Sequence, residues 1–95
     1  MKGLRFEWDE RKAQLNKSKH GVTFDEACSA FADPWALIFE DSRHSLDEER
    51  FIIIGASEHL RVLAVSYCEK TARDTIRIIS ARKANDREAR LYNRR

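Results

Sequence analysis

The second half of the chain contains four short apolar segments separated by polar stretches, and this spacing limits the folds open to the chain. The clearest segment, Arg50–Ala56, includes three consecutive isoleucines and is typical of a central strand buried on both faces. The other segments cover residues 35–40, 61–67 and 75–80. Because the turns at 57–60 and 69–74 are too short for a parallel crossover, we expect an antiparallel meander of four strands.

The first 20 residues indicate a strand followed by a helix. Residues 4–8 alternate apolar and charged side chains, which predicts a short, half-buried strand. Asp9 can cap the helix that follows, and this helix runs to about Lys19. Gly21 can adopt the left-handed conformation that ends a helix.

Two more helices are predicted from their capping residues. Thr23 and Glu26 have the spacing of a capping box, and Asp33-Pro34 ends the helix that they begin. Asn85 and Glu88 have the same spacing near the C-terminus. The sequence therefore predicts an α+β fold. A short N-terminal strand and two helices pack on an antiparallel β-sheet of about four further strands, and a C-terminal helix follows.

Length and composition favour one domain over residues 1–95. With 95 residues, of which 42% are hydrophobic, the chain can bury one modest core. No apolar run approaches the length of a membrane span, and no secretory signal is recognisable. Cys28 and Cys68 lie far apart without a metal-binding or redox spacing, and we interpret them as reduced. We expect a cytoplasmic protein that does not contact membranes.

Charge is distributed unevenly along the chain. The totals of 18 basic and 16 acidic residues leave a net charge of only +2. From Glu69 onward, however, nine basic residues face four acidic ones, and seven of the nine are arginines. The planar guanidinium fork suits phosphate oxygens, so this quarter favours phosphate or nucleic-acid contact as much as a solvated surface.

The densest polar cluster is the segment RIISARK, from Arg77 to Lys83. In a regular strand Ile76, Ile78, Ser80 and Arg82 share one face, and Arg77, Ile79, Ala81 and Lys83 share the other. Arg82 and Lys83 then emerge where the sheet gives way to the last helix. They are either surface charges or a phosphate clamp held by a rigid strand.

The corner Lys19-His20 is the second candidate. The helix dipole alone explains cations there, but a loop imidazole can also exchange a proton near neutral pH. The histidines at 20, 44 and 59 are too far apart to indicate a metal site.

Two further positions have alternative interpretations. Glu49-Arg50 is either a surface ion pair or part of the groove that holds Arg82. Tyr92 either packs the last helix or offers a stacking surface to a base.

Several of these segments together resemble a known family. They are FEWDERKAQLNKSKHGVTFDEA (6–27), the stop at 31–34, Glu49-Arg50 before an apolar strand ending in Gly55, and RIISARKA (77–84) with Glu88 and Tyr92. The combination is similar to BrnT, a family of ribonuclease toxins of bacterial type II toxin–antitoxin pairs.

The resemblance implies a RelE-like fold and a toxin that inhibits translation by cutting RNA. It also implies a BrnA-like antitoxin with a ribbon-helix-helix domain, through which the complex binds operator DNA and represses its own operon. The matching positions in this chain are Lys19, His20, Glu49, Arg50, Arg82 and Lys83, with Tyr92 more distant.

For metal-free RNA cleavage, which needs no cofactor, we expect Arg82, Lys83 and Arg50 to stabilise phosphate charge. His20 or Glu49 is the candidate base. Lys19, Arg77 and Tyr92 are candidate RNA-binding residues. The alternative is a non-catalytic RNA- or partner-binding module that serves mainly as the antitoxin-docking subunit of a repressor complex.

Overall fold

The computed structural model describes residues 3–42, 49–70 and 74–94 and contains a five-stranded sheet with three α-helices. His44 and the middle of the turn predicted over 69–74 lie outside the described residues. The elements are β1 (Arg5–Glu7), α1 (Glu10–His20), α2 (Phe24–Ser29), the 3₁₀ helix η1 (Ala30–Ala32), β2 (Leu37–Glu40), β3 (Arg50–Ala56), β4 (Val62–Lys70), β5 (Thr75–Lys83) and α3 (Asp86–Arg94).

The predicted meander is confirmed. Strands β2, β3, β4 and β5 are antiparallel neighbours, in the sheet order β1-β5-β4-β3-β2. The first strand joins this sheet as well, because β1 pairs with β5 in parallel, with Arg5 opposite Thr75. Parallel pairing is possible here because the whole chain from α1 to β4 connects the two strands. The predicted α+β class is confirmed. The sheet is mixed rather than purely antiparallel, because β1 pairs in parallel with β5 at its edge.

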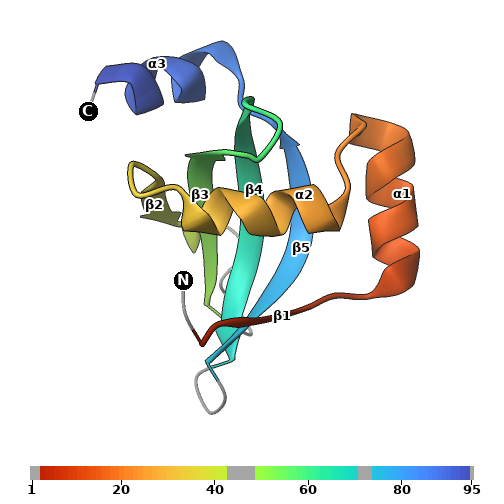
Figure 1. The fold of residues 1–95 in the computed structure, drawn as a ribbon. Coiled ribbons are helices and arrows are strands. Elements are labelled where there is room, and N and C mark those ends of the chain that lie inside the picture. Colours follow the sequence, from red (N-terminus) through yellow and green to blue (C-terminus); the bar gives the residue numbers. More distant parts are fainter. Residues whose placement is uncertain (1–2, 43–48, 71–73, 95) are drawn as a thin grey trace.

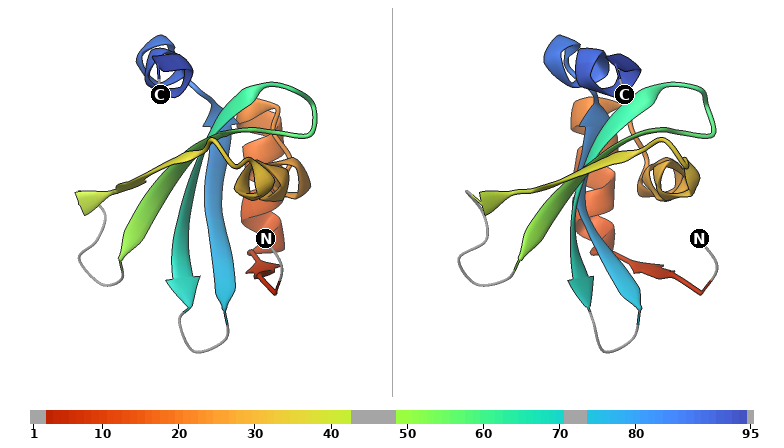
Figure 2. Two further views of the ribbon diagram at one scale, coloured as in Figure 1. Left: turned by 60° about the vertical axis from the view of Figure 1, so that its left-hand side comes forward. Right: turned by 90° about the vertical axis from the view of Figure 1, so that its left-hand side faces the viewer.

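The helices cover one face and two borders of the sheet. Figures 1 and 2 show α2 lying across one face, with α1 beside β5 and α3 beyond the ends of the strands. The core between α2 and the sheet contains Val22, Phe24, Ala27, Phe31, Ile53, Leu63, Val65, Tyr67, Ile76, Ile78 and Ala81. No helix among the described residues is long and apolar enough to cross a membrane.

The predicted capping residues begin and end the helices as expected. The Asp9 carboxylate accepts hydrogen bonds from the backbone of the first turn of α1, and Gly21 ends that helix at φ 69°. Asn85 and Glu88 form a complete capping box, in which each side chain accepts from the other's backbone N–H, at 2.8 and 2.9 Å.

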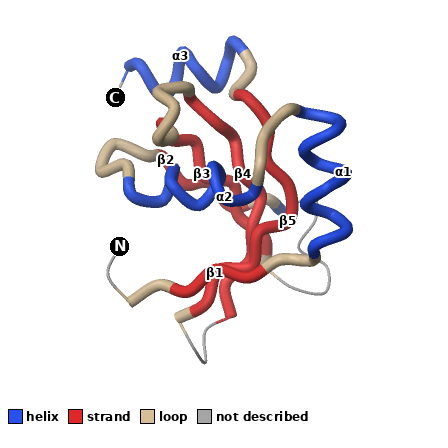
Figure 3. Tube along the Cα trace, turned by 45° about the vertical axis from the view of Figure 1, so that its right-hand side comes forward, coloured by secondary structure: helices blue, strands red, loops and turns tan. Residues whose placement is uncertain are grey.

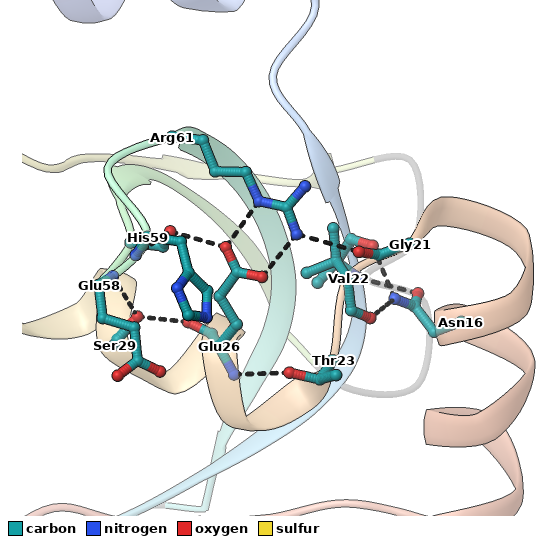
Figure 4. Close-up of polar contacts among 11 residues, drawn as sticks. Asn16, Gly21, Val22, Thr23, Glu26, Ser29, Glu58, His59 and Arg61 are labelled. Carbon is teal, nitrogen blue, oxygen red and sulfur yellow. Dashed lines mark hydrogen bonds and ion pairs between the residues drawn. The ribbon is translucent and has the colours of Figure 1, made fainter.

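The capping box at Thr23 forms only in part, because the Glu26 carboxylate turns into the protein. The Thr23 hydroxyl accepts from the Glu26 N–H at 3.0 Å, as expected. The Glu26 carboxylate instead accepts from Ser57 Oγ at 2.7 Å and from the Arg61 guanidinium at 2.6 and 2.7 Å (Figure 4). Glu26 is only 3% exposed, so this network fastens the β3–β4 hairpin to α2.

A close approach between η1 and β3 requires Gly55. A Cβ atom at this position would lie 2.9 Å from the backbone oxygen of Ala30 and 3.1 Å from the Cβ of Ala36. Glycine thus allows the helical layer to sit directly on the sheet.

We expect Glu26→Ala to lower the free energy of unfolding by roughly 2 kcal/mol, because it removes the buried carboxylate that accepts from Ser57 and from the partly exposed Arg61 guanidinium. Arg61 holds the pKa of Glu26 below its ordinary value of 4.5, so the stabilisation is complete above that pH and is lost as the pH falls through the lowered pKa.

Urea unfolding of the wild type and Glu26→Ala between pH 3 and 7 measures this difference, with the exposed Glu58→Ala as the matched control. If the difference in free energy of unfolding between wild type and Glu26→Ala stays constant down to pH 3, the stabilisation does not come from the ionised Glu26 carboxylate.

Candidate functional site

The register of β5 against β4 shifts by one residue near the middle of the strand. Ile78 pairs with Tyr67, whereas Ser80 pairs with Ser66, so Ile79 is an extra residue in β5. Such a bulge bends the strand and changes which side chains share a face.

The bulge changes the alternation that the sequence predicted. Ile76 and Ile78 lie in the core, as does Ala81, whereas Ser80 and Arg82 line a hollow outside it. The prediction that Ile76 and Ile78 share a face with Ser80 and Arg82 is therefore wrong. The single inserted residue turns Ser80 and Arg82 away from the core.

A polar hollow lies on the face of the sheet turned away from α2. Ile53, Val65 and Ala81 belong to the core, so alternation places their strand neighbours Ile52, Ser66 and Arg82 on the opposite face. The hollow measures about 280 Å³ and is named here the sheet hollow. Its lining residues are Asp41, Arg50, Ile52, Ser66, Ile79, Ser80 and Arg82.

Two guanidinium groups face this hollow from different strands. Arg50 begins β3 and Arg82 lies near the end of β5, so the two approach from opposite sides of β4. Between them Ser66 and Ser80 are direct cross-strand partners, and both hydroxyls can donate hydrogen bonds. Guanidinium and hydroxyl donors around one concavity form a site suited to a phosphate group.

Glu88 holds the guanidinium of Arg82 in place. Nη1 and Nη2 of Arg82 donate to the two carboxylate oxygens of Glu88 at 2.7 and 3.0 Å. The hydrogen bonds from Arg82 lower the pKa of Glu88, and the same contact raises the pKa of Arg82. Both groups are therefore charged at neutral pH. The Arg82 side chain remains 40% exposed, so it can still contact a ligand.

A second, smaller hollow adjoins the first at the edge of β5. It measures about 210 Å³ and is named here the edge hollow. Lys19 and His20 line it from the C-terminal end of α1, and Ile79 and Ser80 line both hollows. The fold thus brings His20 next to the site of Arg50 and Arg82. Its other lining residues are Lys12, Leu15 and Asn16.

Two of the predicted catalytic residues do not line either hollow. Glu49 is exposed just before β3, and Lys83 is exposed at the last position of β5. The backbone oxygen of Lys83 accepts from Arg82 at 3.3 Å. Their catalytic roles stay predictions.

Two of the predicted RNA-binding residues have partners within the protein. Arg77 donates to Glu7 of β1 at 2.8 Å, about 16 Å along β5 from Arg82 at the usual rise per residue. Tyr92 is only 8% exposed, and its hydroxyl donates to Asp33 at 2.5 Å. The structure gives Tyr92 a packing role in holding α3, and base stacking by Tyr92 stays a prediction.

The sequence interpretation missed Ser66 and Asp41 as residues of the site. A signal for Ser66 was present, because it is the one small polar residue within the otherwise apolar and aromatic stretch 62–67 that precedes the turn. Asp41 carried no such signal, since it follows the short strand β2 in a polar stretch.

The thiols offer no nucleophile. Burial raises the pKa of Cys28 to about 11, so this thiol is protonated at neutral pH. Cys68 is buried in β4. Among the described residues no three His, Cys, Asp or Glu side chains are grouped closely enough to hold a metal ion.

Comparison with known proteins identifies the family. The family described as ribonuclease toxin, BrnT, of type II toxin-antitoxin system matches residues 8–88. A crystal structure of the Brucella abortus ribonuclease toxin BrnT is 27% identical and has a TM-score of 0.67, over 87% of this chain and 99% of that chain. No curated protein matches significantly. The RelE-like designation stays a prediction. The match over most of its length shows that this chain belongs to the BrnT family of type II toxin–antitoxin toxins.

Proposed function

We propose that this toxin is an endoribonuclease that cleaves RNA without a metal ion and thereby inhibits translation. The observation that carries the proposal is the sheet hollow, where Arg50 and Arg82 meet two serine hydroxyls beside His20. The family's description as ribonuclease toxins supports it.

The reaction requires a base, cations and an acid. The ribose 2′-oxygen loses its proton to the base and attacks the adjacent phosphorus to form a phosphorane, and the bond from phosphorus to the 5′-oxygen then breaks. The products are a 2′,3′-cyclic phosphate and a 5′-hydroxyl, which takes a proton from the acid. Arg50 and Arg82 would stabilise the negative charge of the phosphorane between these two steps.

His20 is the better supported of the two candidate bases. It lines the edge hollow, which shares Ile79 and Ser80 with the sheet hollow, whereas Glu49 is exposed and lines neither. An imidazole can also exchange protons at neutral pH, as the reaction requires. Asp41 also lines the sheet hollow and is the one carboxylate among its lining residues.

The RNA strand would approach along the edge hollow. Lys19 is exposed at its border and can contact a phosphate there. Arg77 and Tyr92 would extend the contact surface only if they left Glu7 and Asp33, respectively.

A type II toxin has an antitoxin as its partner. We propose that this partner is BrnA-like, with a ribbon-helix-helix domain that supplies the DNA contact when the complex represses its operon in the cytoplasm. The chain has a net charge of only +2, and DNA binding depends largely on positive charge that neutralises phosphates. This small charge supports the assignment of the DNA contact to the antitoxin rather than to the toxin.

We expect Arg82→Ala and Arg50→Ala each to reduce kcat for RNA cleavage by about 10²–10³-fold, since each removes a cation from the phosphate site. Arg82→Lys should recover little of the kcat that Arg82→Ala loses, because an ammonium group cannot make the two parallel contacts of a guanidinium. The exposed Arg87→Ala on α3 is the matched control and should cleave normally. Wild-type rates in both hollow variants would rule out this site.

Cleavage should persist in EDTA, and an oligonucleotide with a single 2′-deoxyribose at the cut position should remain intact there. Purified toxin, freed of antitoxin, is incubated with total RNA and with this oligonucleotide, and products are resolved on a denaturing gel. Loss of cleavage in EDTA contradicts the metal-free scheme. RNA binding that weakens steeply with salt, without cleavage, would indicate the non-catalytic binding module instead.

A further inference from the structure

A single buried amide joins α1 to the edge of β5. Asn16 is 6% exposed, although it lies on a helix that is otherwise largely exposed. Its Nδ2 donates to the backbone oxygen of Ala81 at 2.7 Å, and its Oδ1 accepts from the Ala81 N–H at 3.0 Å. These two contacts satisfy both backbone groups of one strand residue.

The edge of β5 needs such a partner at Ala81. Strand β1 pairs with β5 only from Thr75 to Arg77, so the remainder of this edge is not covered by another strand. Ala81 is completely buried, and its backbone groups would be costly to leave without hydrogen bonds. The carboxamide of Asn16 supplies one donor and one acceptor, as a neighbouring strand would.

The same amide also fixes the chain beyond the helix. Nδ2 of Asn16 donates to the backbone oxygen of Val22 at 2.9 Å, on the far side of the His20-Gly21 corner. Within the corner itself, Arg61 Nη2 donates to the Gly21 oxygen at 3.0 Å (Figure 4). The corner that presents His20 is thus held from two directions.

Asn16 and His20 are four residues apart and therefore lie one helical turn apart on the same face of α1. Both line the edge hollow, together with Ile79 and Ser80 of β5 (Figure 3 shows α1 beside this strand). The residue that Asn16 binds, Ala81, lies between Ser80 and Arg82 in the sequence. Any displacement of α1 along β5 would therefore change the separation of His20 from the sheet hollow.

We propose that Asn16 is a positioning residue for RNA cleavage, whose amide sets the place of His20 relative to Ser80 and Arg82. The inference rests on the proposed ribonuclease function. Loss of the amide lets α1 shift against β5 while leaving Arg50 and Arg82 in the sheet hollow. Such a shift affects the chemical step rather than phosphate binding.

The first test compares Asn16→Ala with the wild type in steady-state RNA cleavage. We expect kcat to fall about 10²-fold, the effect of a small misplacement of a catalytic group, with KM changed less than about twofold. Asp9→Ala is the matched control, because Asp9 caps the opposite end of the same helix. It should lower the melting temperature and keep kcat.

A second readout does not depend on cleavage. Inorganic phosphate is titrated into each protein, and the NMR signals of the His20 ring and the phosphate affinity are followed. In the wild type and Asp9→Ala, phosphate bound by Arg50 and Arg82 should shift the His20 ring signals. In Asn16→Ala this shift should fall at least twofold while the affinity changes less than twofold.

The outcomes separate the two proposals. If the wild type does not cleave RNA, the ribonuclease proposal fails, and the phosphate titration alone decides the role of Asn16. If Asn16→Ala is folded and matches the wild type in kcat and in the His20 shift, the positioning role is overturned. Should Asn16→Ala fail to fold, Asn16→Ser replaces it, because its neutral hydroxyl adds no buried charge and is too short to bridge both backbone groups of Ala81. Wild-type behaviour of that variant overturns the proposal equally.

Discussion

The antiparallel pairing of β4 with β5, shifted by one residue at Ile79, is the interaction on which the candidate site depends. Before the shift, Ile76 and Ile78 point into the core, and after it Ala81 does so, which leaves Ser80 and Arg82 on the outer face. Without the inserted residue a regular strand would direct Arg82 toward the apolar layer beneath α2, where burying its charge would be very costly. The bulge therefore reconciles a continuous core with a polar hollow on the same strand.

Carboxylates fix the direction of several arginines in this structure. Glu88 holds Arg82, Glu26 holds Arg61, and Glu7 holds Arg77. These pairs differ in consequence because their burial differs. The exposed pair with Arg77 contributes little to stability, whereas the buried carboxylate of Glu26 ties the hairpin to α2. Arg61 of this pair also donates to the Gly21 oxygen and so ties the hairpin to the corner after α1. Arg61 and Arg77 are thus less available to a ligand than the number of basic residues suggests, whereas Arg82 keeps 40% of its side chain exposed.

Membership of the BrnT family and the geometry of the two hollows support the same proposal from independent directions. The family describes toxins that act as ribonucleases, and the hollows place a guanidinium pair beside a histidine. The site is assembled from α1, β3, β4 and β5, so it depends on the register of the whole sheet. Asn16 and Glu26 are the buried polar groups that connect the helices to that sheet.

The sequence alone determined the local structure. Helix caps at Asp9 and Asn85, the stop at Gly21 and the apolar strand segments act over a few residues, so their patterns predict the α+β order directly. The tertiary structure decided which residues meet. The parallel place of β1, the bulge at Ile79 and the turn of Glu26 away from Thr23 all depend on partners far along the chain. The shared hollow of Arg50, Ser66 and Arg82 has the same origin, because cross-strand register sets the neighbours of a side chain and local sequence does not.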